Sequence, residues 1–258
     1  MSARGSIFVI QPQEEYCCMK WHIGCAGFYY RDWKGIFYPQ ELVQKKWFKY
    51  YASTFNSIEL NGTFYKLPKT ENLQKWYDDS PADFSFAVKA PRLVTHYKQF
   101  KDCKTVLDEF YTIIQQGLHE KLSVVLFQLP PSFSYSPEKL DLIIETLSPQ
   151  CKNVLEFRHQ SWWQKEVYQQ LSKHHIIFSG VSHPTLPDEA IINDSIVYYR
   201  FHGVPKLYYA EYDKAFLKKI ADRFLQQKKL QEAFLYFNNT ATLAAINNAR
   251  WLIEYVSK

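Results

Sequence analysis

Three triplets place charged side chains at the ends of apolar runs that should form buried strands. Glu59-Leu60-Asn61 follows Ser57-Ile58, Glu156-Phe157-Arg158 follows Asn153-Val154-Leu155, and Arg200-Phe201-His202 follows residues 196–199. Residues i and i+2 of a strand share a face, so the polar pair of each triplet points one way and the Leu or Phe between them points the other. Three strands with polar C-terminal ends predict one pocket assembled from several strands.

Strand-like and helical segments alternate along the whole chain. The predicted strands are 20–25, 57–61, 84–89, 122–128, 153–158, 176–181, 196–202 and 233–238. The predicted helices are 41–53, 71–79, 101–117, 137–148, 161–174, 213–229 and 240–256. A repeated strand-helix order gives parallel strands with right-handed crossovers. Eight such strands predict an α/β fold, a TIM-barrel-like (β/α)8 barrel, with an open doubly wound sheet as the alternative.

Two stretches depart from this regular pattern. The connection 182–195 contains two prolines and leaves little room for a helix, so the barrel should be irregular between strands six and seven. Residues 1–18 fit no part of the pattern and are expected to be a disordered leader, or to precede a true start at Met19. Residues 19–258 are expected to form a single TIM-barrel-like domain.

Composition narrows the class of protein but not its activity. Hydrophobic residues make up 47% and charged residues 22% of the 258 residues, as in ordinary soluble proteins. A net charge of +5 permits binding to nucleic acid without requiring it. Five cysteines without a Cys-x-x-Cys motif argue against a zinc ribbon or a disulfide framework and favour a cytoplasmic location. No apolar run approaches the ~20 residues of a membrane span.

The polar residues at the strand ends are the candidate site. In parallel α/β barrels the pocket lies at the C-terminal rim of the strands, so side chains from separate strands should meet there. Any one of them could form a structural ion pair, but burying several charges together is costly without a function. The residues are Glu59, Asn61, Lys89, Gln128, Glu156, Arg158, Arg200, His202, Asn238 and Asn239.

The residue types of this set suggest acid-base chemistry on an anion. Glu59 and His202 are predicted to move protons, and Glu156 is predicted to orient Arg158. The excess of cations predicts a small anionic ligand, a carboxylate or a phosphate. The predicted substrate-binding residues are Asn61, Lys89, His96, Gln128, Arg158, Trp162, Arg200, Asn238 and Asn239.

Other interpretations of the same residues remain open. Glu59 and Glu156 could form a glycosidase-like carboxylate pair, although Arg158 should keep Glu156 ionised. The same glutamates with His202 and His183 could bind a metal, but no metal-binding spacing supports that, and the predicted metal ligands are none. Neither a glycine-rich phosphate loop nor a dinucleotide fingerprint is present, so the sequence identifies no cofactor.

Several ordered motifs give the chain a family resemblance from about residue 21 to 256. It closely resembles the domain-of-unknown-function 72 family, also called YecE-like, which implies a TIM-barrel-like fold and no established reaction. Where that family usually has Gly-Thr-Ser-Gly and an Asp after strand six, this chain has Gly-Cys-Ala-Gly at 24–27 and Val-Ser-His-Pro at 181–184. The motifs are Ile23–Gly27, Trp33–Pro39, Glu59–Tyr65, Phe86–Pro91, Thr95–His96, Phe127–Pro131, Glu156–Trp162, Tyr199–Gly203 and Phe237–Asn239.

Two functional hypotheses follow from the sequence. The first is a cytoplasmic enzyme of the hydrolase or lyase/isomerase type that acts on a small anionic substrate at the rim of the barrel. The second is a non-catalytic nucleic-acid-binding protein that uses a basic rim and exposed aromatic side chains. Neither hypothesis involves a membrane, and the sequence predicts no oligomeric state.

Overall fold

The computed structural model describes residues 19–258, so the predicted disordered leader at 1–18 lies outside the described residues. The strands are β1 (Lys20–Cys25), β2 (Ser57–Leu60), β3 (Ser85–Lys89), β4 (Leu122–Leu129), β5 (Asn153–Phe157), β6 (Ile177–Phe178), β7 (Gly180–Ser182), β8 (Ile196–Phe201) and β9 (Glu232–Phe237). The α-helices are α1 (Trp47–Ala52), α2 (Thr70–Asp79), α3 (Lys104–Leu118), α4 (Pro137–Thr146), α5 (Lys165–Lys173), α6 (Lys214–Leu225) and α7 (Ala244–Val256).

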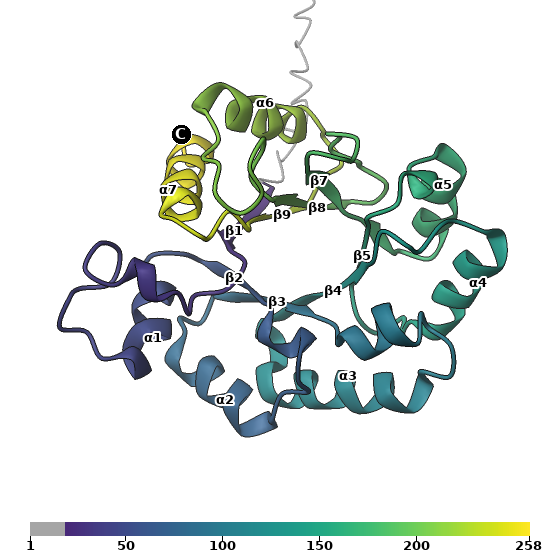
Figure 1. The fold of residues 1–258 in the computed structure, drawn as a ribbon, viewed down its shortest axis with the longest axis horizontal. Coiled ribbons are helices and arrows are strands. Elements are labelled where there is room, and N and C mark those ends of the chain that lie inside the picture. Colours follow the sequence, from purple (N-terminus) through teal and green to yellow (C-terminus); the bar gives the residue numbers. More distant parts are fainter. Residues whose placement is uncertain (1–18) are drawn as a thin grey trace, which may run out of the picture.

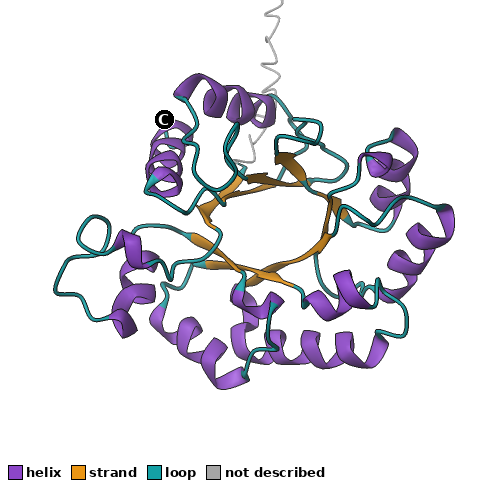
Figure 2. Ribbon diagram, in the orientation of Figure 1, coloured by secondary structure: helices purple, strands orange, loops and turns teal. Residues whose placement is uncertain are grey.

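The strands form two parallel sheets that face a common interior. One sheet has the order β1-β9-β8-β7 and the other the order β2-β3-β4-β5-β6. The ribbon shows the strands around a central space, with the helices on the outside (Figure 1; Figure 2). The predicted α/β class is therefore confirmed. A closed (β/α)8 barrel is not confirmed, because the backbone hydrogen bonds between neighbouring strands stop at the two boundaries between the sheets.

The predicted sixth strand is two short strands. β6 pairs with β5 in one sheet and β7 pairs with β8 in the other, with Ser179 between them. Gly180 begins β7 at a crowded point, where a Cβ atom would lie 2.6 Å from the Tyr199 ring and 2.7 Å from the Glu189 carbonyl oxygen. The chain thus passes from one sheet to the other within 176–182. No helix follows in 183–195, as expected from the two prolines in the connection 182–195.

Side chains join the two sheets at their other boundary, between β1 and β2. The Tyr51 hydroxyl accepts a hydrogen bond from the Cys25 amide (2.7 Å) and donates one to the Ser57 carbonyl (3.0 Å). Asn56 accepts from the Ile23 amide at 3.1 Å. A Cβ atom on Gly24 would lie 2.0 Å from the Ser57 carbonyl oxygen, so the close approach of the two strands requires glycine there.

Replacement of Tyr51 by phenylalanine is therefore expected to destabilise the protein by roughly 1–3 kcal/mol, because a buried amide and a buried carbonyl would both lose their partner. The free energy of unfolding in urea measures the change. Tyr29 is 60% exposed and provides the matched control, since Tyr29→Phe should have little effect. Equal stability of Tyr51→Phe and the wild type would show that the hydroxyl does not hold the two strands together.

Alternation along the strands places a compact apolar layer inside the ring. Ala87, Val124, Leu126 and Tyr236 each precede a polar strand-end residue by two or four positions and so share its face, and all four lie in one buried cluster. Its other members are Val154, Ile177, Ile196, Tyr198 and Phe234. The residues between them pack outward in a larger core with the helices. In the part of the chain that the structure describes, no helix has the length and apolar character needed to cross a membrane.

Candidate active site

A buried ion network lies above the apolar layer and joins both sheets. Arg200 of β8 donates from Nη2 to Glu59 Oε1 and from Nη1 to Glu156 Oε2, each at 2.6 Å. Glu59 belongs to β2 and Glu156 to β5, and all three side chains are at most 1% exposed. The structure thus brings together the first residue of each triplet, as the sequence predicted.

The remaining carboxylate oxygens are also occupied. Glu59 Oε2 accepts a hydrogen bond from the Tyr198 hydroxyl at 2.6 Å, and Glu156 Oε1 binds Nε of Arg158. Burial raises the pKa of Glu156, but the positive charges of Arg158 and Arg200 outweigh burial and hold it well below its usual range. The contact between Glu156 and Arg158 is compatible with the predicted orienting role of Glu156. Both oxygens of Glu59 bind buried donors, which disfavours the predicted role of Glu59 in proton transfer.

His202 is held as a neutral ring between two fixed partners. Arg158 Nη2 lies 3.0 Å from His202 Nε2, and the Asn238 amide lies 2.9 Å from Nδ1. A guanidinium can only donate, so Nε2 accepts, Nδ1 carries the proton and Asn238 must present its amide oxygen. Burial and then Arg158 lower the pKa of His202 well below its ordinary value. These contacts and the lowered pKa disfavour the predicted acid-base role of His202 and favour a positioning role.

Lys89 is the titratable group of the site that no carboxylate neutralises. Its Nζ donates to Gln128 Oε1 at 2.9 Å and lies 4.2 Å from the centroid of the Phe64 ring. The side chain is 9% exposed. Burial and then Arg200 lower the pKa of Lys89 to about 7, against the weaker opposing effect of the two glutamates. The amine can therefore gain or lose a proton near neutral pH.

Exposure increases from the buried network toward the rim. Arg158 is 12% exposed as a side chain and follows the C-terminal end of β5. His96 packs edge-on against Phe64, and burial and then the positive charge of Lys89 lower its pKa. The half-buried polar side chains at or just beyond the strand ends, and in the turn after β3, are Asn61, His96, Gln128, Arg158, His183 and Asn238.

Two predicted substrate-binding residues lie elsewhere. Trp162 is fully buried, stacks on Phe157 and donates from its indole to the Phe133 carbonyl at 2.7 Å. Asn239 turns away and donates to Asn248 Oδ1 at 3.0 Å and to the Ala210 carbonyl at 2.9 Å. Trp162 lies five residues beyond β5 and Asn239 two residues beyond β9, so the path of the loop, and not the alternation of the strand, sets where each side chain points.

Sequence reasoning missed Tyr198 and Phe64. Tyr198 precedes Arg200 by two residues on the same inward face, so the alternation of β8 already contained this signal. Phe64 lies in a short 3-10 turn, Gly62–Phe64, and reaches Lys89 only through the fold. No local pattern in the sequence could have identified it.

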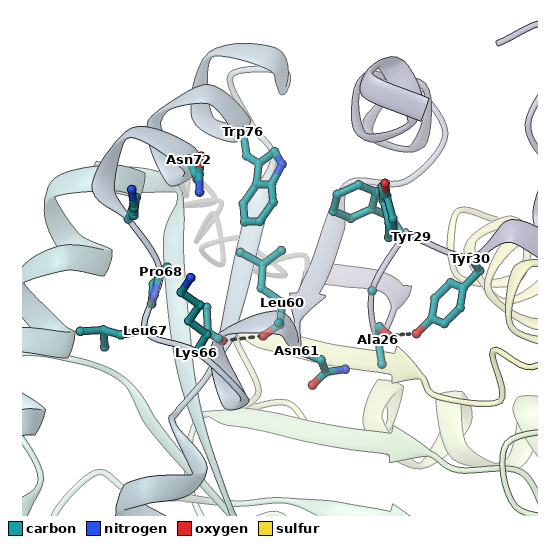
Figure 3. Close-up of a pocket in the computed structure, with 15 residues that line it drawn as sticks. Ala26, Tyr29, Tyr30, Leu60, Asn61, Lys66, Leu67, Pro68, Asn72 and Trp76 are labelled. Atoms are coloured by element: carbon teal, nitrogen blue, oxygen red, sulfur yellow. Dashed lines mark hydrogen bonds between the residues drawn. The ribbon is translucent and has the colours of Figure 1, made fainter. Parts of the chain in front are cut away.

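A separate cavity of about 440 Å³ opens beyond the ends of β1 and β2. Figure 3 shows Trp76 of α2 and Tyr29 from the loop after β1 on either side of it. Among the predicted site residues, only Asn61 lines this cavity, and its buried Oδ1 has no hydrogen-bond partner. The cavity is mostly apolar, so it differs in character from the charged cluster.

Metal binding was the alternative use of the glutamates and His202. Within residues 19–258, no group of three or more His, Cys, Asp or Glu side chains is placed to hold a metal ion. Cys25, the last residue of β1 and part of the first motif, is buried, and burial raises the pKa of its thiol.

The site and the fold define a class of α/β proteins in which charges at the ends of parallel strands meet over an apolar interior. The family model described as "Protein of unknown function DUF72" matches residues 22–258. The chain therefore belongs to the DUF72 family, and the resemblance seen in its motifs is confirmed.

Two relatives match the chain to different extents. UPF0759 protein YunF of Bacillus subtilis (strain 168) is 27% identical over an alignment of 273 positions, gaps included. The alignment covers 90% of this chain and 93% of YunF. UPF0759 protein YecE of Escherichia coli (strain K12) is 30% identical over 118 residues, or 45% of this chain and 42% of YecE.

Solved structures share the fold. A DUF72 family protein from Thermotoga maritima superimposes with a TM-score of 0.83 at 30% identity, over 93% of this chain and 100% of that protein. Another from Enterococcus faecalis gives a TM-score of 0.77 at 18% identity, over 92% of this chain and 96% of that protein. At 18% identity, the second likeness shows the fold alone.

Proposed function

We propose that this protein is an enzyme that binds a small anionic substrate, a carboxylate or a phosphate, at the rim of the charged cluster. The observation that carries the proposal is the charge balance of the network. Glu59 and Glu156 offset Arg158 and Arg200, and His202 is neutral. A protonated Lys89 therefore leaves one uncompensated positive charge in the cluster, which an anion would neutralise.

The chemistry of the proposed enzyme centres on the Lys89 amine. A group whose pKa lies near the working pH exchanges protons efficiently, and the pKa of Lys89 is lowered to about 7. Arg158 is the guanidinium of the pair nearer to solvent and would bind the anion. This arrangement suits proton abstraction next to a carbonyl, and so favours lyase or isomerase chemistry over hydrolysis.

The proposal also concerns the fold, because backbone pairing gives two sheets and does not decide whether they form one barrel. We infer that the two sheets act as one (β/α)8-type barrel in a single domain. Side chains of Tyr51 and Asn56 link β1 to β2, and the segment 176–182 contributes a strand to each sheet. Arg200 then ties β8 to β2 and β5 across the interior. Free thiols at Cys25, Cys103 and Cys151 support a reducing, cytoplasmic location.

Calorimetric titration with sulfate and with pyruvate tests the anion site, because neither probe changes its protonation near neutral pH. Binding at pH 8 is expected to take up a fraction of a proton, since the anion stabilises the Lys89 ammonium. Titrations in buffers of different ionisation enthalpy measure that fraction. Arg158→Gln should weaken binding about tenfold or more. Arg223→Gln on α6, at the surface, is the matched control and should bind as the wild type does.

Binding of both anions by Arg158→Gln with wild-type affinity would contradict the proposal. The nucleic-acid alternative has its own signature. Six phosphate contacts would lower the affinity for an oligonucleotide about 10³-fold between 50 and 200 mM salt. Such a salt dependence, together with absent sulfate and pyruvate binding, would favour the alternative over the enzyme.

A further inference from the structure

The Lys89 amine is buried without the partners that a structural lysine has. Among residues 19–258, no carboxylate oxygen forms an ion pair with its Nζ within 4.0 Å. Its one hydrogen bond goes to the Gln128 amide oxygen, although an ammonium has three protons to donate. The nearby carboxylates of Glu59 and Glu156 are instead occupied by Arg158 and Arg200.

Lys121 shows what a satisfied buried lysine looks like in the same fold. It is 6% exposed, comparable with Lys89. Its Nζ donates to the Tyr77 carbonyl, the Ser80 carbonyl and the Ser80 hydroxyl at 2.7, 2.9 and 3.0 Å. Three oxygen acceptors match the three protons of an ammonium. Burial alone therefore does not distinguish Lys89, whereas the shortage of acceptors does.

The surroundings of Lys89 favour the neutral amine, which is the nucleophilic form. Arg200 lies close enough to lower the pKa of Lys89 together with burial. A lysine that is desolvated and placed beside another cation is an activated nucleophile toward carbonyl carbon. The Phe64 face under Nζ would also stabilise a positively charged nitrogen formed there.

We propose that Lys89 forms an imine with a small carbonyl compound that carries an anionic group, of which a 2-oxo acid is the simplest example. This inference rests on the proposed function, because Arg158 would bind the anionic group and so direct the neighbouring carbonyl to Nζ. Lys89 ends β3, while Gln128 of β4 pairs in register with Glu156 of β5, two residues before Arg158. Lys89 and Arg158 therefore stand at the ends of strands separated by β4 alone, and Arg158 is near enough to contribute to the lowered pKa of Lys89.

The reaction balances without a further reagent. Nζ attacks the carbonyl carbon to form a C–N bond, and the carbonyl π pair takes a proton to give a carbinolamine. The C–O bond then breaks, and the oxygen leaves as water with the two protons that the amine supplied. The net change is amine plus carbonyl to imine plus water, with no oxidation or reduction.

Reductive trapping with pyruvate and sodium cyanoborohydride at pH 7.5 tests the inference. Peptide mass spectrometry should find the reduced adduct at least tenfold more abundant on Lys89 than on Lys121 or on the exposed Lys66. Lys89→Met should remove that adduct. Arg158→Gln should lower it about tenfold with pyruvate and leave it unchanged with acetone, which has no anionic group.

Each departure from these results has a distinct meaning. Labelling of Lys89 no stronger than that of Lys66 would overturn the imine. If pyruvate still bound with proton uptake, the anion site of the proposed function would stand while the covalent step would fall. Equal trapping of pyruvate by Arg158→Gln and the wild type would refute the directing role of Arg158.

Discussion

Replacement of Arg200 by methionine is expected to destabilise the protein by roughly 3–5 kcal/mol. Arg200 is the partner of Glu59 and Glu156, and all three side chains are buried. Removing the guanidinium leaves Glu59 without a charge partner in a low-dielectric interior and leaves Glu156 with Arg158 alone. The cost of an orphaned buried charge exceeds the value of the contact itself. The free energy of unfolding in urea at pH 7 measures the loss.

The pH dependence of the Arg200→Met variant separates charge from packing. In the wild type the pKa of Glu156 is lower in the folded state than in the unfolded state. Glu156 therefore stabilises the fold at pH values above its ordinary, unfolded-state pKa, and this stability is lost as the pH falls through the folded-state pKa. In the variant, burial without Arg200 raises the pKa of the carboxylates, so they take up protons as the pH falls and lose their penalty. The deficit of the variant should therefore shrink toward pH 4. Lys104→Met removes the exposed ion pair with Asp108 and should change little. A deficit that stays constant from pH 7 to 4 would attribute the loss to packing alone.

Replacement of Lys89 by methionine is expected to have the opposite sign and to stabilise the protein at pH 6 by roughly 1–4 kcal/mol. The folded state lowers the pKa of Lys89 from 10.5 to about 7, so below pH 7 folding forces a proton onto a group that its surroundings disfavour. Methionine removes that penalty and loses only the hydrogen bond to Gln128 and the contact with Phe64. A stabilising substitution at a site is the sign of a residue kept for function.

The lowered pKa of Lys89 also determines how the stability of the protein depends on pH. Between about pH 7 and 10.5 the unfolded chain binds the Lys89 proton and the folded chain does not, so this group makes stability rise with pH. The stability difference between Lys89→Met and the wild type should therefore be largest below pH 7 and decline through that window. Urea unfolding at pH 6, 8 and 10 measures it. A Lys89→Met variant less stable than the wild type at pH 6 would mean that the ammonium is well accommodated.

Alternation of residue type predicted most of the candidate site. The i, i+2 pattern placed Glu59, Lys89, Glu156 and Arg200 on inward faces, and the structure finds all of them there. Prediction failed where that constraint ends. Asn239 lies just past β9 and turns toward Asn248, because a residue beyond the strand follows its loop.

The sequence also could not indicate which groups remain chemically available. Glu59 and His202 have the residue types of acid-base catalysts, yet each has its polar atoms bound by a buried neighbour. Lys89 had been assigned only to anion binding, although its surroundings make it the titratable group. A pKa depends on burial and on charges from distant strands, which local sequence does not contain.

The amino-acid order by itself determined the α/β class and the direction in which each strand's polar side chains point, because both follow from periodicities of two to four residues. Only the tertiary structure decided the pairing of those side chains. The contact between Arg200 and Glu59 joins positions 141 residues apart. Such a contact exists only when the strands surround a common interior, and there the competition for two carboxylates leaves one amine without an ion pair.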